Sequence, residues 1–168
     1  MQDLHSKLVE LLVSHDVHYR VIEHAPEGRT ELVSAMRGHD VRLAAKCMLM
    51  IVKLGKKVTR YVLGVVPGHT RLDLETVKAV LGATYVSLAS PAKVEELCGS
   101  VVGTVLPFSF NPDVDVIVDP SLLKNEYMYF NAARLDRSFA LRTQDYVGVA
   151  RPRMERIAML ERSQEDLR

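Results

Sequence analysis

The segment RLAAKCMLMIVKL, residues 42–54, decides the fold that we expect for this chain. It is an apolar run with the length of one strand, and Lys46 lies inside it near its start. Moving an ammonium group out of water is costly unless the group meets a partner. The position of Lys46 therefore needs a physical explanation.

Alternation along a strand places two sets of side chains on opposite faces: Lys46, Met48, Met50 and Val52 on one, and Cys47, Leu49 and Ile51 on the other. Because the methionines should face a core or a pocket, Lys46 lies at the end of an inward face. Two interpretations are open. The lysine can extend along the strand edge with its head in water, or it can point into a cavity and meet an anionic or carbonyl group there.

The rest of the chain has alternating strand and helix signals. Residues 45–54 and 58–66 form a hairpin around the turn LGKK. Helices are predicted, from apolar spacing and capping residues, over residues 3–15, 30–37, 74–81, 91–98 and 143–150. Further strands are predicted within residues 17–24, 113–120, 126–131 and 138–142.

The interleaving of these elements has no steady βαβ rhythm, and the chain has neither a G-x-G-x-x-G nor a G-x-x-x-x-G-K-[ST] phosphate loop. We therefore expect an α+β fold with a mixed, strongly curved β-sheet. Residues 1–150 should form a single domain, and residues 151–168 a charged C-terminal tail or helix.

The formal net charge of the 168 residues is only +1, which argues against a protein dedicated to binding nucleic acids. The basic residues are unevenly distributed. Residues 29–60 contain eight Lys or Arg and two acids, so this segment is +6 and the remainder −5. The basic segment can contact phosphates, or it can be a solvated face that is rich in lysine.

The two cysteines, Cys47 and Cys98, lie in apolar segments and are too few for a disulfide framework, which favours reduced thiols in the cytoplasm. The N-terminus lacks the features of a signal peptide, and no apolar run is long enough to span a membrane. The six histidines have no metal-ligand spacing, so we expect neither a metal nor another cofactor.

Two further segments are candidates for a site. In GTVLPFSFNP, residues 103–112, glycine lets a backbone approach a ligand closely and proline stiffens the loop. Asn131 lies where a strand gives way to a loop, which is a frequent location for binding residues. Each segment can also be an ordinary turn.

Taken in order, the strand lysine, VVPGHTRLD, LASPAKVEELCGSVVGTVLPF, VIVDPSLL and YFNAARLDRSFAL resemble the YbaK family, over about residues 20–150. These are stand-alone relatives of the editing domain inserted in bacterial prolyl-tRNA synthetases. The sequence is most similar to the YeaK-like branch. The most specific feature is the G-x-x-x-P loop of residues 103–107.

The resemblance implies a barrel-like mixed β-sheet flanked by helices, with the pocket between them. It also implies a trans-editing enzyme that hydrolyses the ester between a wrong amino acid and tRNA. It implies catalytic roles for Lys46 and Asn131. The substrate-binding residues that it implies are Gly103, Thr104, Val105, Pro107, Phe108 and Thr30. The partner is the acceptor end of mischarged tRNA, and an aminoacyl-tRNA synthetase is a second candidate partner. The chain is expected to be a monomer or a homodimer without membrane contact.

An aminoacyl ester is already activated, so such an enzyme needs mainly positioning and an oxyanion site. Backbone N–H groups of the glycine loop can hold the ester carbonyl, and Lys46 can supply positive charge. On this interpretation the partner of Lys46 is the substrate and is absent from the free protein. The +6 segment receives the acceptor stem of the tRNA. The terminal 2′-hydroxyl of the tRNA helps to activate the nucleophile that attacks the ester. Editing excludes the larger, correct residue, so serine, alanine or threonine is the expected amino acid.

Two other functions fit the same residues. One is a non-catalytic module that binds tRNA or a synthetase through the basic face. The other is a Schiff-base enzyme with Lys46 as the amine nucleophile, although no aldehyde- or cofactor-binding motif accompanies the lysine.

Overall fold

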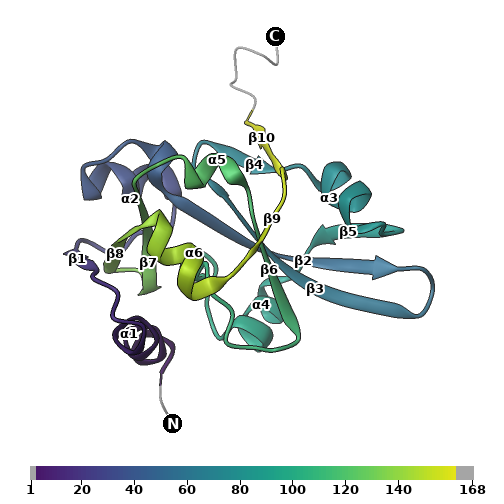
Figure 1. Ribbon diagram of the computed structural model, residues 1–168, viewed down its shortest axis with the longest axis horizontal. Helices are drawn as coiled ribbons and strands as arrows, with labels where there is room; N and C mark the ends of the chain where they lie inside the picture. Colours follow the sequence, from purple (N-terminus) through teal and green to yellow (C-terminus); the bar gives the residue numbers. More distant parts are fainter. Residues whose placement is uncertain (1–2, 162–168) are drawn as a thin grey trace.

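A computed structural model describes residues 3–161 of the chain. A five-stranded sheet runs through its centre (Figure 1). In spatial order its strands are β5 (Tyr85–Leu88), β2 (Ala45–Leu54), β3 (Val58–Pro67), β6 (Val114–Val118) and β9 (Arg153–Met154). β5 and β3 run antiparallel to β2, while β6 runs parallel to β3 and β9 runs parallel to β6. The sheet is therefore mixed, as the sequence predicts.

The β2–β3 hairpin confirms the expectation from residues 42–54. Its register runs without interruption from Ala45 opposite Pro67 to Leu54 opposite Val58. Gly55, in the turn, has a φ of +71°, which a residue with a side chain rarely adopts. The continuous pairing of the long hairpin therefore fixes the position of Lys46 near the start of β2.

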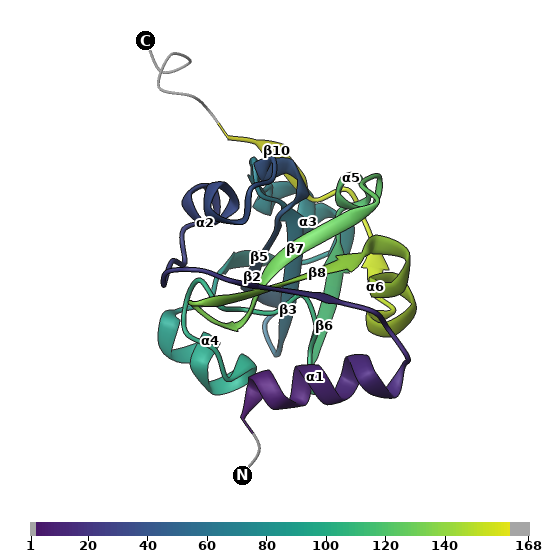
Figure 2. The ribbon, with the colours of Figure 1, turned by 90° about the vertical axis from the view of Figure 1, so that its left-hand side faces the viewer.

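Two smaller sheets lie beside the central one. The first contains β1 (Arg20–Glu23), β8 (Arg137–Arg142) and β7 (Tyr127–Arg134), and Figure 2 shows it nearest the viewer. The second contains β10 (Ala158–Leu160) and β4 (Thr70–Leu72).

The prediction of a strongly curved, barrel-like sheet is wrong, because no sheet within residues 3–161 is closed. Ladder pairing does not continue from β7 into the central sheet. The two are joined there only by an isolated bridge between Ala44 and Tyr129. The structure is instead a layered α+β fold.

The helices are short and are capped as the sequence predicts. Asp73 accepts a hydrogen bond from the backbone N–H of Thr76, and Ser90 accepts one from that of Lys93. The helices are α1 (Leu4–Ser14), α2 (Thr30–Arg37), α3 (Leu74–Leu81), α4 (Pro91–Cys98), α5 (Pro120–Leu123) and α6 (Thr143–Ala150), with a 3-10 turn, η1 (Val41–Leu43). None of the described helices is long and apolar enough to cross a membrane.

The core consists of two clusters on opposite faces of β2. Leu49 belongs to the larger cluster, which fills the space between the central and three-stranded sheets and includes Leu8 and Leu12 of α1. Met50 and Val52 belong to the smaller cluster, which lies against α3. The alternation predicted along β2 is therefore confirmed.

The C-terminal segment differs from the expected helix or tail. Residues 151–161 are extended and contribute β9 and β10, while residues 162–168 lie outside the described part. Besides the strand pairing of β9 with β6 and of β10 with β4, a buried carboxylate holds this segment. Asp119 Oδ2 accepts hydrogen bonds from the N–H groups of Ile157, at 2.8 Å, and Ala158, at 2.7 Å. Asp119 Oδ1 accepts from the backbone and hydroxyl of Ser121.

We predict that Asp119→Asn lowers the free energy of unfolding by about 2 kcal/mol at neutral pH, because an amide nitrogen cannot accept the N–H bonds that the carboxylate accepts. Burial raises the pKa of Asp119, but the hydrogen bonds from Ser121, Ala158 and Ile157 outweigh it and bring the pKa below 3.8. The difference from wild type should therefore be complete above about pH 4 and disappear as the pH falls through the lower folded pKa. Urea unfolding at several pH values measures it.

Asp115→Asn is the matched control, since this exposed carboxylate lies on β6, which ends just before Asp119. It should change the free energy of unfolding by less than about 0.5 kcal/mol. Equal stability of the two variants at neutral pH would show that Asp119 does not hold the C-terminal segment.

Candidate active site

A cavity of about 630 Å³ brings together residues from four parts of the chain. The four main parts are residues 27–37 with α2, the start of β2, the loop at residues 102–105 and the end of β7 with Leu135, and Gly68 adds to the wall. Among the predicted site residues, those that line the cavity are Lys46, Asn131, Gly103, Val105 and Thr30. These five residues, among which Thr30 and Asn131 are 101 positions apart in the chain, therefore lie around one cavity.

The other three predicted residues do not line this cavity. Thr104 is buried and donates its hydroxyl to the carbonyl of Val101, which stabilises the turn. The carbonyl of Pro107 accepts a hydrogen bond from the hydroxyl of Tyr146. Phe108 belongs to the larger core cluster. All three residues stabilise the loop through contacts outside the cavity.

Glycine allows two loops to approach each other at the cavity wall. Gly103 has a φ of +94°, and a Cβ atom built on it would lie 2.8 Å from the Cα of Gly28. Gly68 is similarly crowded, because its Cβ would lie 2.5 Å from the carbonyl oxygen of Val41 and 2.8 Å from a methyl carbon of Thr30. A side chain at either position would push the wall apart.

The side chain of Asn131 joins these loops. Its Nδ2 donates to the carbonyl oxygens of Glu27 and Gly103, both at 2.9 Å. Its Oδ1 accepts from the guanidinium of Arg37 at 2.9 Å and is 3.0 Å from the hydroxyl of Ser138. Because both N–H groups and one lone pair of the amide have partners and the residue is buried, Asn131 is held in place and holds both loops in turn.

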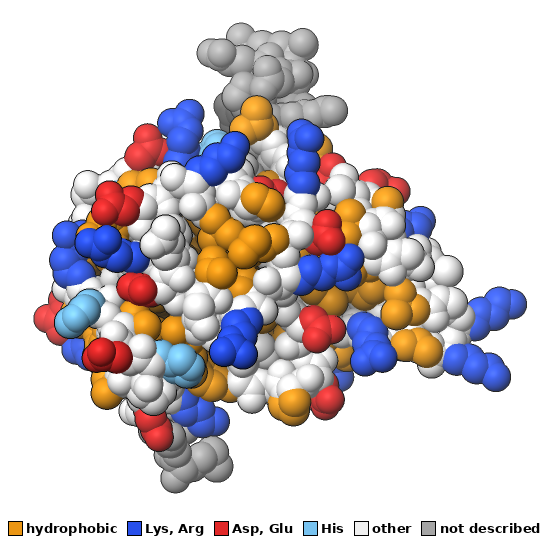
Figure 3. Space-filling view, in the orientation of Figure 1, with side chains coloured by type: hydrophobic (Ala, Val, Ile, Leu, Met, Phe, Trp, Pro, Cys, Tyr) orange, Lys and Arg blue, Asp and Glu red, His pale blue; other side chains and the backbone are white. Residues whose placement is uncertain are grey.

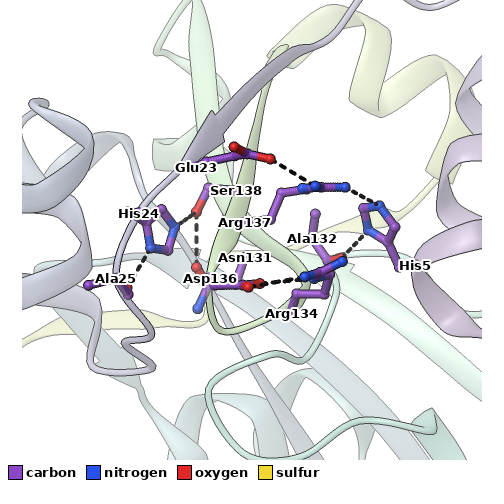
Figure 4. A network of polar contacts seen from close by, with 10 residues as sticks. All are labelled: His5, Glu23, His24, Ala25, Asn131, Ala132, Arg134, Asp136, Arg137 and Ser138. Carbon is purple, nitrogen blue, oxygen red and sulfur yellow. Dashed lines mark hydrogen bonds and ion pairs between the residues drawn. The ribbon is translucent and has the colours of Figure 1, made fainter.

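Ser138 links Asn131 to His24 (Figure 4). The Nδ1 of His24 faces the carbonyl of Ala25 at 2.9 Å, so a neutral ring carries its proton there and accepts at Nε2. Ser138 Oγ lies 2.7 Å from that Nε2 and accepts from Arg37 Nε at 2.7 Å. The single hydroxyl proton can therefore go to His24 or to Asn131, but not to both.

Arg37 is a largely buried cation at the cavity wall. Its hydrogen-bond partners are the neutral groups of Ser138, Asn131 and His39, and no carboxylate among residues 3–161 lies within ion-pair distance. Burial lowers its pKa to about 10, so it stays charged at neutral pH. Arg37 therefore brings to the cavity a positive charge that has no ion-pair partner among the described residues.

Lys46 has two partners, which corrects the expectation that its partner is absent. Its Nζ donates to Glu161 Oε1 at 2.8 Å and to the carbonyl oxygen of Thr70 at 3.0 Å. The side chains of Lys46 and Glu161 are 23% and 42% exposed, so the ion pair is partly solvated and weak. A substrate group can replace Glu161 at modest cost.

Two other ionisable groups at the cavity are poor nucleophiles or bases. Burial raises the pKa of the Cys47 thiol, which therefore stays protonated. Hydrogen bonds from Arg29 lower the pKa of Glu27 to about 2, so this carboxylate is a weak base. Among the described residues, no group of His, Cys, Asp and Glu could hold a metal ion.

The basic segment does not form one surface around Lys46. Lys46 and Lys53 lie near opposite ends of β2, about 23 Å apart at 3.3 Å per residue. Figure 3 shows Lys and Arg side chains at the tip of the β2–β3 hairpin, on the right, whereas Lys46 and the cavity lie at the other end of β2. The charge of residues 29–60 is thus divided between the hairpin tip and the cavity.

Comparison with known proteins shows which family the chain belongs to. Residues 24–149 match the model of the aminoacyl-tRNA editing domain. The chain is 37% identical over 151 residues to the multifunctional Ser/Thr-tRNA deacylase ProXp-y of Escherichia coli K12, covering 89% of this chain and 90% of that protein. The chain belongs to the aminoacyl-tRNA editing domain family.

More distant relatives share parts of the chain or the fold. A proline–tRNA ligase of Thermosipho melanesiensis is 27% identical over 135 residues, which are 74% of this chain and 23% of the ligase. A crystal structure of a candidate trans-editing enzyme for prolyl-tRNA synthetase superposes with a TM-score of 0.77 at 20% identity, over 95% of this chain and 99% of that one. A hypothetical protein gives a TM-score of 0.82 at 21% identity, over 91% and 99% of the two chains.

Sequence reasoning missed Arg37, Gly28 and Gly68, which line this cavity, and Glu161, which pairs with Lys46. Arg37 is at the end of an amphipathic helix, where a solvated position is the ordinary expectation. Gly28 lies in APEG, a turn-like stretch without a distinctive spacing. Only the contacts across the fold identify these positions.

We predict that Gly103→Ala lowers kcat/KM for ester hydrolysis by about 10²-fold, because the added methyl group displaces the loop from Gly28 and misplaces the groups that face the substrate. Gly99→Ala is the control. Gly99 also has a positive φ, of +69°, but its Cβ would meet nothing within 4 Å. Both variants should lose roughly 1 kcal/mol from backbone strain. Equal activities in a deacylation assay would show that the contact with Gly28 has no part in the site.

Proposed function

We propose that this chain acts in trans as an aminoacyl-tRNA deacylase, which hydrolyses the ester of a small amino acid on mischarged tRNA. The observation that supports this most is the convergence of Lys46 and the Gly103 loop on one cavity in a chain of the editing-domain family. Because the Escherichia coli relative is named for serine and threonine, esters of these two amino acids are the first candidates, with alanine next.

The Gly103 loop supplies the oxyanion site in this mechanism. Gly103 and Val105 line the cavity, and their backbone N–H groups have no acceptor among residues 3–161. The N–H of Thr104 is different, since it donates to the carbonyl of Val101. Two free N–H groups on a rigid loop can bind the ester carbonyl and, more strongly, the oxygen that becomes negative during the attack.

Lys46 adds positive charge at the same place. When a substrate enters, an anionic oxygen takes the position of Glu161 on the ammonium group, while the bond to the carbonyl of Thr70 keeps the lysine in place. Asn131 has a positioning role in this mechanism, because both N–H groups of its amide are used in holding the loops of Glu27 and Gly103.

The nucleophile is a water molecule, and neither Cys47 nor Glu27 is an effective general base to take its proton. Cys47 stays protonated and Glu27 is a weak base, as their pKa shifts indicate. The 2′-hydroxyl of the terminal ribose is then the group best placed to assist the water. Hydrolysis of an activated ester is possible this way because the enzyme contributes mainly position and charge.

Specificity comes from the size of the cavity. Its apolar wall includes Val33, Met48, Val102 and Leu135. A hydrophobic pocket separates two amino acids that differ by one methylene by only about 1–3 kcal/mol, so exclusion of the larger residue is the effective way to discriminate. The correct amino acid is thus rejected because it does not fit.

A non-catalytic module that binds tRNA or a synthetase is the second candidate, and the unneutralised charge of Arg37 is compatible with it. The similarity to part of a proline–tRNA ligase also makes a synthetase a candidate partner. A cytoplasmic location, where translation occurs, fits either function.

We predict that Lys46→Met lowers kcat/KM for the preferred Ser-, Thr- or Ala-tRNA by about 10²–10³-fold, since it removes the charge that stabilises the oxyanion. Deacylation of a panel of tRNAs charged with these amino acids, including mischarged tRNA(Pro) and tRNA(Thr), measures the effect. Lys53→Met is the control, because Lys53 is exposed on the same strand.

Loss of activity in the Lys46 variant alone would establish editing and name the amino acid. If wild-type protein cleaves no ester in the panel but binds tRNA with a steep salt dependence, the enzyme is excluded and the binding module replaces it.

We predict that Glu161→Gln raises kcat/KM by up to about fivefold, because a partly solvated ion pair that competes with substrate is worth at most about 1 kcal/mol. Glu155→Gln, which alters an ion pair with Arg153 in the same segment, should leave kcat/KM unchanged. A fall in activity of the Glu161 variant would contradict competition and indicate that Glu161 orients the lysine for the reaction.

A further inference from the structure

A second hollow opens on the outer face of the three-stranded sheet. It is lined by tyrosines, arginines and a histidine, namely His18, Tyr19, Arg20, Tyr127, Tyr129 and Arg142, with Ala140 and Asp145. The inner face of the same sheet contributes Met128 and Phe130 to the core. The outer face contributes no side chain of this hollow to the buried core clusters, yet it carries two tyrosines and two arginines of the sheet, Tyr127, Tyr129, Arg20 and Arg142.

The strand register builds the hollow. Ala140 on β8 lies between Arg20 of β1 and Tyr129 of β7, since it pairs with both. Tyr127 and Arg142 form the next pair along. The small side chain of Ala140 therefore leaves a floor between larger planar groups.

The planar groups are arranged in cation–π pairs. The guanidinium carbon of Arg20 is 5.8 Å from the centre of the Tyr129 ring, and its Nη2 donates to the Tyr129 hydroxyl at 3.0 Å. The guanidinium carbon of Arg142 is 5.6 Å from the centre of the Tyr127 ring, and Tyr127 is 39% exposed. One tyrosine ring is thus held in place, while the other is open to a ligand.

The charge of the hollow suits an anionic ligand. No carboxylate among residues 3–161 lies within ion-pair distance of Arg20. Arg142 has only a long contact, 3.9 Å, with the exposed Glu126. Asp145 is the acid that lines the hollow itself.

The hollow continues toward the Lys46 cavity. The His39 ring stacks on Tyr129, with centres 3.8 Å apart, and Arg37 lies 3.5 Å from His39 Nε2. Burial lowers the pKa of His39, so its ring is neutral and stacks as an uncharged aromatic. Asn131, at the cavity, is two residues from Tyr129 on β7, or about 7 Å. A row of polar and aromatic groups therefore connects the two sites.

We propose that this hollow binds an unpaired nucleobase of the tRNA 3′ end, next to the terminal nucleotide, with a neighbouring phosphate on Arg20 or Arg142. The inference rests on the proposed function for its ligand. Stacking of bases on aromatic side chains beside arginine is the common way to hold single-stranded nucleic acid, because every base has a planar face and every nucleotide a charge. The Lys46 cavity then receives the aminoacyl group, and the hollow fixes the direction in which the 3′ end of the tRNA runs.

The test uses the full chain and its Tyr127→Ala, Tyr127→Phe, Arg20→Ala and Tyr85→Ala variants, each first checked for a wild-type melting temperature. Tyr85 is an exposed tyrosine of β5 outside the hollow, so Tyr85→Ala is the matched control. The substrates are seryl-tRNA and 3′-O-seryl-adenosine, which carries the ester but no further nucleotide. Binding is measured with an uncharged acceptor minihelix and the same minihelix without its last three nucleotides.

We expect Tyr127→Ala to raise KM for seryl-tRNA about tenfold with little change in kcat, and Tyr127→Phe and Tyr85→Ala to behave as wild type. Arg20→Ala should weaken tRNA binding and reduce its salt dependence. Hydrolysis of seryl-adenosine should not respond to any of these variants. Tyr127→Ala should also abolish the preference for the intact minihelix over the shortened one.

An unchanged KM for seryl-tRNA in Tyr127→Ala, or an equal loss on seryl-adenosine, would overturn the proposal, while the Lys46 variant would still decide the reaction separately. If the wild-type protein hydrolyses neither substrate but prefers the intact minihelix through Tyr127, the hollow stands and the proposed reaction fails.

Discussion

The amide nitrogen of Asn131 donates to the carbonyl oxygens of Glu27 and Gly103, and the form of the cavity depends on these two bonds. They draw together a loop before α2 and a loop after α4, which have no strand pairing between them. Close approach is possible because Gly28 and Gly103 have no side chains where the backbones meet. β7 supplies the rigid support, since its next residues, Phe130 and Ala132, are buried in the core.

The same sheet geometry explains why a lysine can stand at the end of an apolar strand. β2 has a core cluster on each face, so its central side chains are fixed by packing. At its first residues the clusters end and the cavity begins, which gives Lys46 a direction but only partial burial. The lysine therefore avoids most of the desolvation cost and keeps an exchangeable partner in Glu161.

Local patterns predicted the parts of the fold that depend on local physics. The β2–β3 hairpin follows from its apolar runs and turn, and the helix ends follow from Asp73, Ser90 and their glycines. The way in which the central and three-stranded sheets meet could not be predicted. A closed barrel would need continuous pairing between their edge strands, and here only one isolated bridge, between Ala44 and Tyr129, joins them. β10 escaped prediction since its partners, the strand β4 and the carboxylate of Asp119, are distant in the chain. Lys46 and Gly103 were recognisable as candidates, whereas Arg37 and Glu161 act through contacts 94 and 115 residues apart in the chain.

The central claim is that the Gly103 loop and Lys46 act together on the ester carbonyl. A crystal structure with the non-hydrolysable amide analogue of 3′-seryl-adenosine tests it most directly. We predict that the carbonyl oxygen of the analogue lies within hydrogen-bond distance of the backbone N–H of Gly103 or Val105, and that Lys46 has left Glu161 for the ligand. An analogue whose carbonyl faces away from this loop, with the Lys46–Glu161 ion pair intact, would contradict the mechanism.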